Sequence, residues 1–402
     1  MEEEIKGFLA KYDLDVRKSN DARFMDQKVT PDVLCIIADC VVNHLAGDSS
    51  KEFTVKDIWH SKYFISNVQA IFNKPTPIAS LARSEYDKFI QQPLRMMSYA
   101  KVLNCRRKGS VNIYSVQSAE LLEYIALRPR CSFDFLYVYL CKTLSDSGLL
   151  KYFQSYKQQF RKRRLSGHNF DELKDRFQRF ILGNTRIRGK VEINRIFPKI
   201  LNIYAAKNFI PGTIKGKMSK TPYNYSDLMY NRVNWRDKDK NKSVARQAAG
   251  SDSDGEMASK AYNNYLVQKA ISIIKNKYRQ SEVNDQWATG DATQVHHIFP
   301  KNQFPGIAHY VENLVKLTPT QHFTKAHPKN STTKIDKDYQ LVCLIAKSDS
   351  IEKSIEAGEL IYRKECFIRV INEGVSRLTT FEFKNTMGYP EIKSGLVYYY
   401  NL

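Results

Sequence analysis

Two adjacent histidines stand out in the segment VHHIFPKNQF, residues 295–304. A neutral imidazole can accept a proton near physiological pH, and it can also donate a lone pair to a metal ion. His296 and His297 are therefore candidates for both tasks. Successive side chains of a β-strand point to opposite faces, so the pair predicts two different roles rather than one shared role.

The residues that follow predict a compact strand, loop, strand and helix. The loop KNQFPGIAHYVE leads into NLVKL, an apolar, strand-like stretch that begins at Asn313. In TPTQHFTKAHP, Thr318 suits the N-cap position, Pro319 the first helical position, and Gln321 completes a capping box. Pro328 disfavours helical backbone just before it. The expected helix is therefore short, and it carries His322.

This pattern of residues 293–328 resembles the HNH, or ββα-metal, nucleases, and its TPxxH ending is similar to the nuclease domains of DNase colicins. The resemblance implies that His296 and His322 are metal ligands and that His297 is the general base that activates water. It implies that Asn313 supports the loop by hydrogen bonds. The addition of a large basic portion is most like an HNH-type type II restriction endonuclease, by analogy of architecture alone.

One position departs from the family pattern. The colicin-type domains place a further metal-binding histidine four residues after the TPxxH histidine, where this chain has Ala326, and the histidine here is His327. On an α-helix, five residues put His327 about 140° from His322. We therefore expect His327 to reach a metal only if the helix frays before Pro328. A shell of two histidines completed by water and phosphate oxygens favours Mg²⁺, with Mn²⁺ as a substitute.

Charge points to a polyanionic partner. The 402 residues carry a formal net charge of +21, and residues 151–220 hold 18 Lys or Arg against 4 Asp or Glu. Such concentration favours a nucleic-acid surface over a generally basic exterior. Interleaved Tyr and Asn would add contacts to base edges. The candidate DNA-binding residues are Arg161, Lys162, Arg163, Arg164, Arg186, Arg188 and Lys190.

We expect a mostly helical α+β chain in four parts. Residues 1–150 predict helices and a short strand, an order that resembles a winged-helix DNA-recognition domain and also suits many other small domains. Residues 151–236 form the basic DNA-contacting region, and 237–257 a flexible linker or exposed loop. Residues 258–402 hold the nuclease domain, with helices after its core motif at 293–328 and an edge strand expected in the tail LVYYYNL.

The remaining features of the sequence bear on the cellular location of the protein. No run of about 18 apolar residues predicts a membrane span, and the acidic N-terminus lacks a signal-peptide core. The seven cysteines are scattered and form no CxxC pair, so neither a zinc ribbon nor a disulfide framework is expected. These features indicate a cytoplasmic protein.

The leading hypothesis is a sequence-specific, metal-dependent endonuclease that cuts duplex DNA, as a type II restriction enzyme with a cognate DNA methyltransferase. One HNH unit cuts one strand at a time, so double-strand cleavage needs a homodimer or a reorientation. The alternatives are a homing, nicking or toxin HNH nuclease, and a non-catalytic DNA-binding protein with a degenerate nuclease fold.

Overall fold

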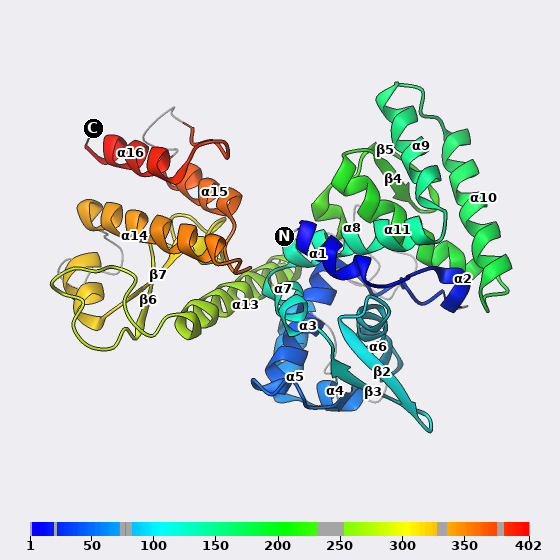
Figure 1. The fold of residues 1–402 in the computed structure, drawn as a ribbon, viewed down its shortest axis with the longest axis horizontal. Helices are drawn as coiled ribbons and strands as arrows, with labels where there is room; N and C mark the ends of the chain where they lie inside the picture. Colours follow the sequence, from blue (N-terminus) through cyan, green and yellow to red (C-terminus); the bar gives the residue numbers. More distant parts are fainter. Residues whose placement is uncertain are drawn as a thin grey trace. The chain divides into compact units, whose positions relative to one another are not determined.

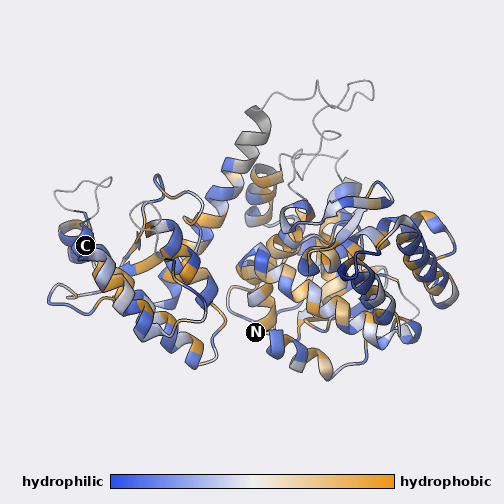
Figure 2. Ribbon diagram, turned by 90° about the horizontal axis from the view of Figure 1, so that it is seen from above, coloured by the Kyte–Doolittle hydropathy of each residue, from blue (hydrophilic) through white to orange (hydrophobic). Residues whose placement is uncertain are grey.

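The computed structural model describes residues 2–19, 22–72, 77, 83–230, 253–327, 336–375 and 382–401. The chain divides into two compact units, Met1–Ala258 and Ser259–Leu402 (Figure 1). Within the described residues the fold is mostly helical with three small sheets, which confirms the expected mostly helical α+β class. Hydrophobic and hydrophilic residues alternate along the helices of both units, as expected for helices that bury one face (Figure 2).

The first unit begins with helices and a three-stranded sheet. Its elements are α1 (Glu2–Ala10), α2 (Val16–Ser19), α3 (Pro31–Leu45), β1 (Phe53–Thr54), α4 (Val55–Trp59), α5 (Lys62–Phe72), α6 (Arg83–Tyr99), β2 (Leu103–Lys108) and β3 (Val111–Val116). The predicted start of α3 at Thr30–Pro31 is confirmed, with Pro31 in the first turn. The sheet has the order β1–β3–β2 with antiparallel pairing. The sequence had indicated β3 but not its partner β2.

The remainder of this unit is a helical layer with a β-hairpin. It comprises α7 (Ala119–Leu127), α8 (Pro129–Asp146), α9 (Leu150–Arg161), α10 (Gly167–Asn184), α11 (Lys190–Asn208), β4 (Pro211–Ile214), β5 (Lys217–Pro222) and η2 (Tyr225–Leu228). Ser118 opens α7 as predicted, because its side chain accepts a hydrogen bond from the backbone N–H of Leu121 at 3.3 Å. α8 and α11 pack together beneath this hairpin (Figure 1).

The second unit surrounds a two-stranded sheet with helices. Its elements are α13 (Ser253–Lys277, which begins just before the unit boundary), β6 (Gln294–His297), η3 (Val311–Asn313), β7 (Leu314–Leu317), η4 (Gln321–Ala326), α14 (Lys337–Glu356), α15 (Lys364–Val375) and α16 (Tyr389–Tyr400). Its core contains Leu314 and Val315 of β7 together with Leu344 and Ile371 of the helices.

The edge strand expected in the C-terminal tail is wrong, because the tail lies in helix α16. Pro390 stands in its first turn, and the Glu391 carboxylate accepts a hydrogen bond from the backbone N–H of Gly388 at 2.7 Å. Ile392 and Leu396, one turn apart, are both buried. The start signals and this spacing outweigh the high β-propensity of the tyrosine run.

The predicted linker 237–257 lies largely outside the described residues, and its last five residues belong to α13. The finer division into a recognition domain, a basic region and a nuclease domain stays a prediction. Among the helices of the described ranges, none is both long enough and apolar enough to span a bilayer.

Candidate functional site

The histidine pair lies on a short antiparallel hairpin of the second unit. β6 pairs with β7 so that His296 stands opposite Val315 and His297 opposite Leu314. One further hydrogen bond, from the backbone N–H of Ile298 to the carbonyl of Asn313 at 2.9 Å, extends the pairing beyond the strand end. This hydrogen bond therefore joins the first and last residues of the loop between the strands, residues 298–313.

Asn313 is fully buried and ties this loop together from inside. Its Oδ1 accepts a hydrogen bond from the backbone N–H of Phe299 at 2.8 Å, and its Nδ2 donates to the carbonyls of Phe299 at 3.0 Å and Ile307 at 3.3 Å. The Phe299 ring lies against α15, so close that a Cβ on Gly374 would stand 2.3 Å from it. These contacts agree with a supporting task for Asn313.

The predicted capping box is present after β7. The backbone N–H of Gln321 donates to Thr318 Oγ1 at 3.2 Å, and the backbone N–H of Thr318 donates to Gln321 Oε1 at 3.0 Å. The Gln321 amide also donates to the carbonyl of Val283 and to an Asp285 carboxylate oxygen, each at 2.9 Å. Gln321 thus anchors the following turn to the segment before β6, a task that its capping role alone did not indicate.

The turn that carries His322 is a π-helix, Gln321–Ala326, rather than an α-helix. The backbone N–H of His327 donates to the carbonyl of His322 at 3.1 Å, five residues back. The turn is therefore wider than an α-helical turn, and His327 returns to a position near His322, with ring centroids 4.8 Å apart. The 140° separation expected for an α-helix does not apply, because the wider turn absorbs the additional residue.

Three imidazoles converge as a result. The ring centroids lie 5.4 Å apart for His296 and His322, 4.9 Å for His296 and His327, and 4.8 Å for His322 and His327. One potential ligand nitrogen from each lies within 4.8 Å of the others. Imidazole nitrogens in such a group are a donor set for divalent transition metals.

The protonation states of these rings suit metal binding. Burial, reinforced by the neighbouring histidines, holds the pKa of His296 well below its usual value. Burial and the neighbouring His327 lower the pKa of His322 to about 4. Both rings are therefore neutral at pH 7, with a lone pair each. Among the residues that the structure describes, none gives the buried Nδ1 of His322 a hydrogen-bond partner, and a bound metal ion would satisfy this atom.

His297 has a different environment. Its Nε2 lies 3.0 Å from the carbonyl oxygen of Ala308, and because that oxygen can only accept, Nε2 carries the proton and donates. The Nδ1 atom of the neutral ring is then the proton acceptor. Burial, opposed by the Ala308 hydrogen bond and assisted by the Lys301 charge, lowers the pKa of His297. The lowered pKa keeps the ring neutral at pH 7, and the hydrogen bond to Ala308 fixes its orientation.

Both histidines of the pair line one hollow of about 450 Å³, although strand alternation predicted separate faces. His297 is the last residue of β6, where the strand gives way to the loop. The lining residues are Val295, His296, His297, Pro300, Lys301, Asn302, Pro305, His322 and His327. Lys301 is exposed at this hollow, and its Nζ donates to Asn264 Oδ1 at 3.0 Å.

The predicted DNA-binding residues all belong to the first unit, and all seven are exposed. They do not form one cluster. Arg161 ends α9 and Lys162–Arg164 occupy the loop before α10, whereas Arg186, Arg188 and Lys190 follow α10. The 18 residues of α10 separate the two groups by about 27 Å, at 1.5 Å per residue.

A buried ion pair lies next to β7 of the β6–β7 hairpin. No local pattern in the sequence indicated it. Lys347 Nζ of α14 lies 2.7 Å from a Glu282 carboxylate oxygen, and both side chains are almost completely buried. Glu282 also accepts a hydrogen bond from the backbone N–H of Lys316 in β7 at 2.8 Å.

Comparison of the chain with family models, with curated proteins and with solved structures gives no match.

Proposed function

We propose that the chain is a metal-dependent endonuclease that hydrolyses phosphodiester bonds of duplex DNA at specific sequences, as a type II restriction enzyme does. The observation that carries the proposal is the convergence of His296, His322 and His327 beside the oriented base His297 in one hollow. The arrangement fits the resemblance to HNH nucleases, in which a strand pair and a short helix supply these groups.

His296, His322 and His327 would hold the cation. Bound there, a divalent cation would relieve negative charge on the phosphate and on the leaving oxygen. The sequence predicted Mg²⁺, because it indicated a site with two histidine ligands and a shell completed by water and phosphate oxygens. Three imidazole nitrogens instead favour Mn²⁺, Zn²⁺ or another transition metal, because Mg²⁺ prefers oxygen ligands. We therefore propose that the three histidines bind a transition metal more tightly than they bind Mg²⁺.

His297 would accept the proton of the attacking water at Nδ1. The hydrogen bond from its Nε2 to the Ala308 carbonyl fixes the tautomer, so the ring does not have to reorient before it accepts the proton. The ammonium group of Lys301, at the same hollow, would position a phosphate oxygen of the substrate. Asn313 would act only by holding the loop that carries Lys301 and the Ala308 carbonyl group.

The test is digestion of a plasmid of known sequence by the full chain with Mg²⁺, Mn²⁺ or Zn²⁺, followed by mapping of the ends. We expect discrete fragments. His297→Ala should lower the cleavage rate by about 10²- to 10⁴-fold, the usual contribution of a general base, while binding to DNA is retained. His309→Ala, a histidine of the same loop that does not line the hollow, is the matched control and should cleave normally.

Four results would contradict the proposal. Random degradation of every DNA would remove sequence specificity and favour a toxin nuclease. Binding without cleavage in all of these metals would favour a non-catalytic DNA-binding protein. Fragments cut in only one strand would favour a nicking enzyme, and recognition of a long, rare site a homing enzyme.

The proposed setting follows from this function. A restriction enzyme acts in the cytoplasm, beside a cognate DNA methyltransferase that protects the host sites. One HNH unit cuts one strand at a time, so cleavage of both strands would use a homodimer or a reorientation of the single unit.

A further inference from the structure

The hollow beside the three histidines has apolar walls that a phosphate group does not need. Val295, Pro300 and Pro305 line it together with the histidines. A metal ion and the Lys301 ammonium group would account for the binding of a phosphate, whereas proline and valine side chains offer it neither charge nor hydrogen bonds. The volume of about 450 Å³ lies within the range of roughly 300–1,000 Å³ of pockets that enclose small ligands. The hollow therefore suits a larger and less polar part of a nucleotide as well.

The loop that carries the two prolines is held in place from behind. The carbonyl of Pro300 accepts hydrogen bonds from the backbone N–H groups of Gln303 at 3.1 Å and Phe304 at 2.9 Å, which closes a tight turn. Further along the loop, the backbone of Gly306 lies so close to α15 that a Cβ there would stand 2.5 Å from Glu373 Oε1. Each proline ring also restricts its own backbone φ to about −65°. The wall is thus preformed, and a ligand would lose little affinity to the ordering of this loop.

Asn302 brings a polar group to the same wall. It belongs to the turn that Pro300 closes, it lines the hollow, and it is exposed. Within the described part of the chain, no group forms a hydrogen bond with the Asn302 side chain. The amide offers two donor hydrogens on Nδ2 and an acceptor on Oδ1. This pair of groups can bind the N6 and N7 atoms of adenine together, so the amide is suited to recognise the edge of a base.

An exposed aromatic ring lies next to the hollow, on the π-turn. Phe323 follows His322 in the sequence, and the two ring centroids lie 4.8 Å apart at an interplanar angle of 85°. Phe323 is 46% exposed. A single exposed apolar side chain is common on protein surfaces and needs no explanation by itself. Because His322 lines the hollow, however, this ring is within reach of a base that enters there, and an aromatic ring stacks on any of the four bases.

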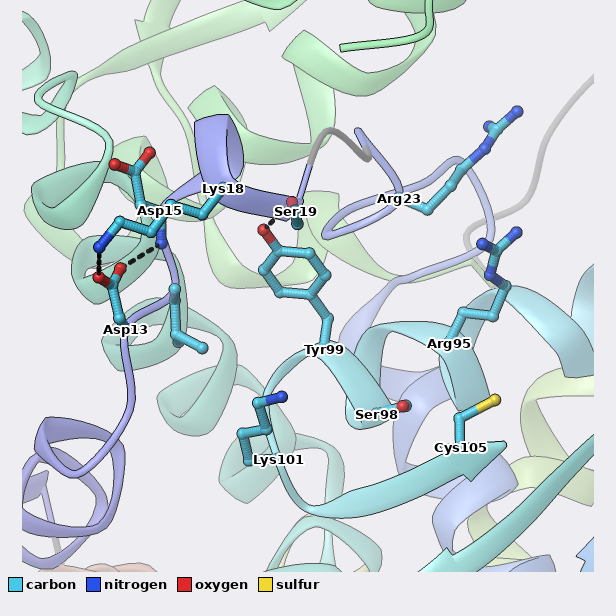
Figure 3. A pocket seen from close by; sticks show the side chains of 11 residues that line it. Asp13, Asp15, Lys18, Ser19, Arg23, Arg95, Ser98, Tyr99, Lys101 and Cys105 are labelled. Carbon is cyan, nitrogen blue, oxygen red and sulfur yellow. Dashed lines mark hydrogen bonds and ion pairs between the residues drawn. The ribbon is translucent and has the colours of Figure 1, made fainter. Parts of the chain in front are cut away.

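A hollow of the first unit, also of about 450 Å³, provides a contrast (Figure 3). The polar groups of that hollow bind one another, since Lys18 pairs with Asp13 and Ser19 Oγ lies 2.7 Å from Tyr99 Oη. A ligand there would have to replace these internal partners. Among the described residues, the Asn302 amide has no such partner to give up. The hollow of the second unit is therefore the better candidate for a site that binds part of a substrate.

We infer that the hollow of the second unit receives one base of the DNA strand, turned out of the helical stack beside the phosphate that is cleaved, and that Asn302 binds the edge of this base. The inference rests on the proposed function, since it names a further part of the substrate that the site holds. The alternative is a hollow filled by water, with Asn302 as an ordinary solvated residue. The two prolines and the exposed Phe323 ring favour a base, because both faces of a base are apolar and stack. An unpaired base would enter most readily, since a paired base must first leave its partner.

The test measures binding of the full chain to short DNA duplexes of one sequence, either fully paired or with one unpaired nucleotide at the centre. A chelator removes divalent metal, so the proposed cleavage does not run and binding alone is measured. We expect the duplexes with an unpaired nucleotide to bind about tenfold or more tightly than the paired duplex, because the base no longer has to leave a pair. The affinity should also depend on which base is unpaired and should be highest for adenine, whose edge matches an amide.

Variants separate the two contacts to the base. Asn302→Ala should remove the dependence on the identity of the unpaired base and keep the general preference for an unpaired nucleotide. Phe323→Ala should weaken binding of the duplexes with an unpaired nucleotide about fivefold or more, whereas Phe323→Tyr, which keeps an aromatic ring, should bind them as the parent does. Gln303→Ala, an exposed residue of the same turn that does not line the hollow, is the matched control. Thermal unfolding that matches the parent would exclude misfolding of each variant.

The outcomes distinguish this inference from the proposed function. Equal affinity for the paired duplex and for every duplex with an unpaired nucleotide would overturn the inference, and so would a base preference that Asn302→Ala leaves unchanged. Discrete plasmid fragments combined with equal affinities would keep the proposed function and remove the inference. A base preference that depends on Asn302, together with no cleavage in any metal, would support the inference while the proposed function fails.

Discussion

Replacement of Asn313 by alanine tests whether this residue supports the loop or takes part in chemistry. The change removes three side-chain hydrogen bonds, of 2.8, 3.0 and 3.3 Å. It leaves the buried N–H and C=O of Phe299 without this partner, and each unsatisfied group costs about 1–3 kcal/mol. The third bond is longer, so we expect the free energy of unfolding of the second unit to fall by about 3–4 kcal/mol.

The loss should appear as a lower melting temperature of that unit. About 3 °C per kcal/mol is usual for a unit of roughly 150 residues, so the transition should shift down by about 10 °C. Calorimetry on the full chain measures the shift, and hydrogen exchange of the loop 298–313 assigns it. Gln303→Ala, an exposed residue of the same loop, is the control. A transition within about 2 °C of the parent, combined with lost cleavage, would refute the supporting role.

Three further predictions concern the same unit. His322→Ala should weaken Mn²⁺ or Zn²⁺ binding by more than about 100-fold in a calorimetric titration, and unchanged affinity would exclude this histidine as a ligand. Lys347→Met should cost about 3–5 kcal/mol in denaturant unfolding, since it leaves Glu282 buried without its counter-charge; the double variant with Glu282→Gln should recover part of that loss. Gly374→Ala should lower the melting temperature despite the better helix propensity of alanine, because the new methyl group meets the Phe299 ring; a higher melting temperature would show that the ring can move aside.

The sequence predicted the parts of the candidate site that depend on local signals. Thr318 and Gln321 stand at the spacing of a capping box, and the structure contains both reciprocal hydrogen bonds. The strand at His296 and the strand after Asn313 were predicted from apolar pattern and order. Their assembly into a nuclease centre, with a bound metal, stays a prediction.

Long-range and irregular features were beyond the sequence. The turn at His322 was expected to be α-helical, and nothing in the helical period indicates a π-turn. Glu282 and Lys347 are 65 positions apart, so their pairing has no local pattern. The basic residues Arg161 and Arg186 were grouped by composition, but α10 places them at its two ends.

The π-turn has a consequence for how a set of ligands can change during evolution. Insertion of one residue between two histidines on a helix normally rotates the second one away and abolishes the pair. Here a backbone hydrogen bond from the N–H of His327 to the carbonyl of His322 closes one wider turn, and the two rings stay next to each other. Deletion of Thr324 should then restore an ordinary α-turn with the histidines four residues apart. Sequence spacing and spatial spacing are therefore separable, and a donor set can survive a change of one residue in the segment that carries it.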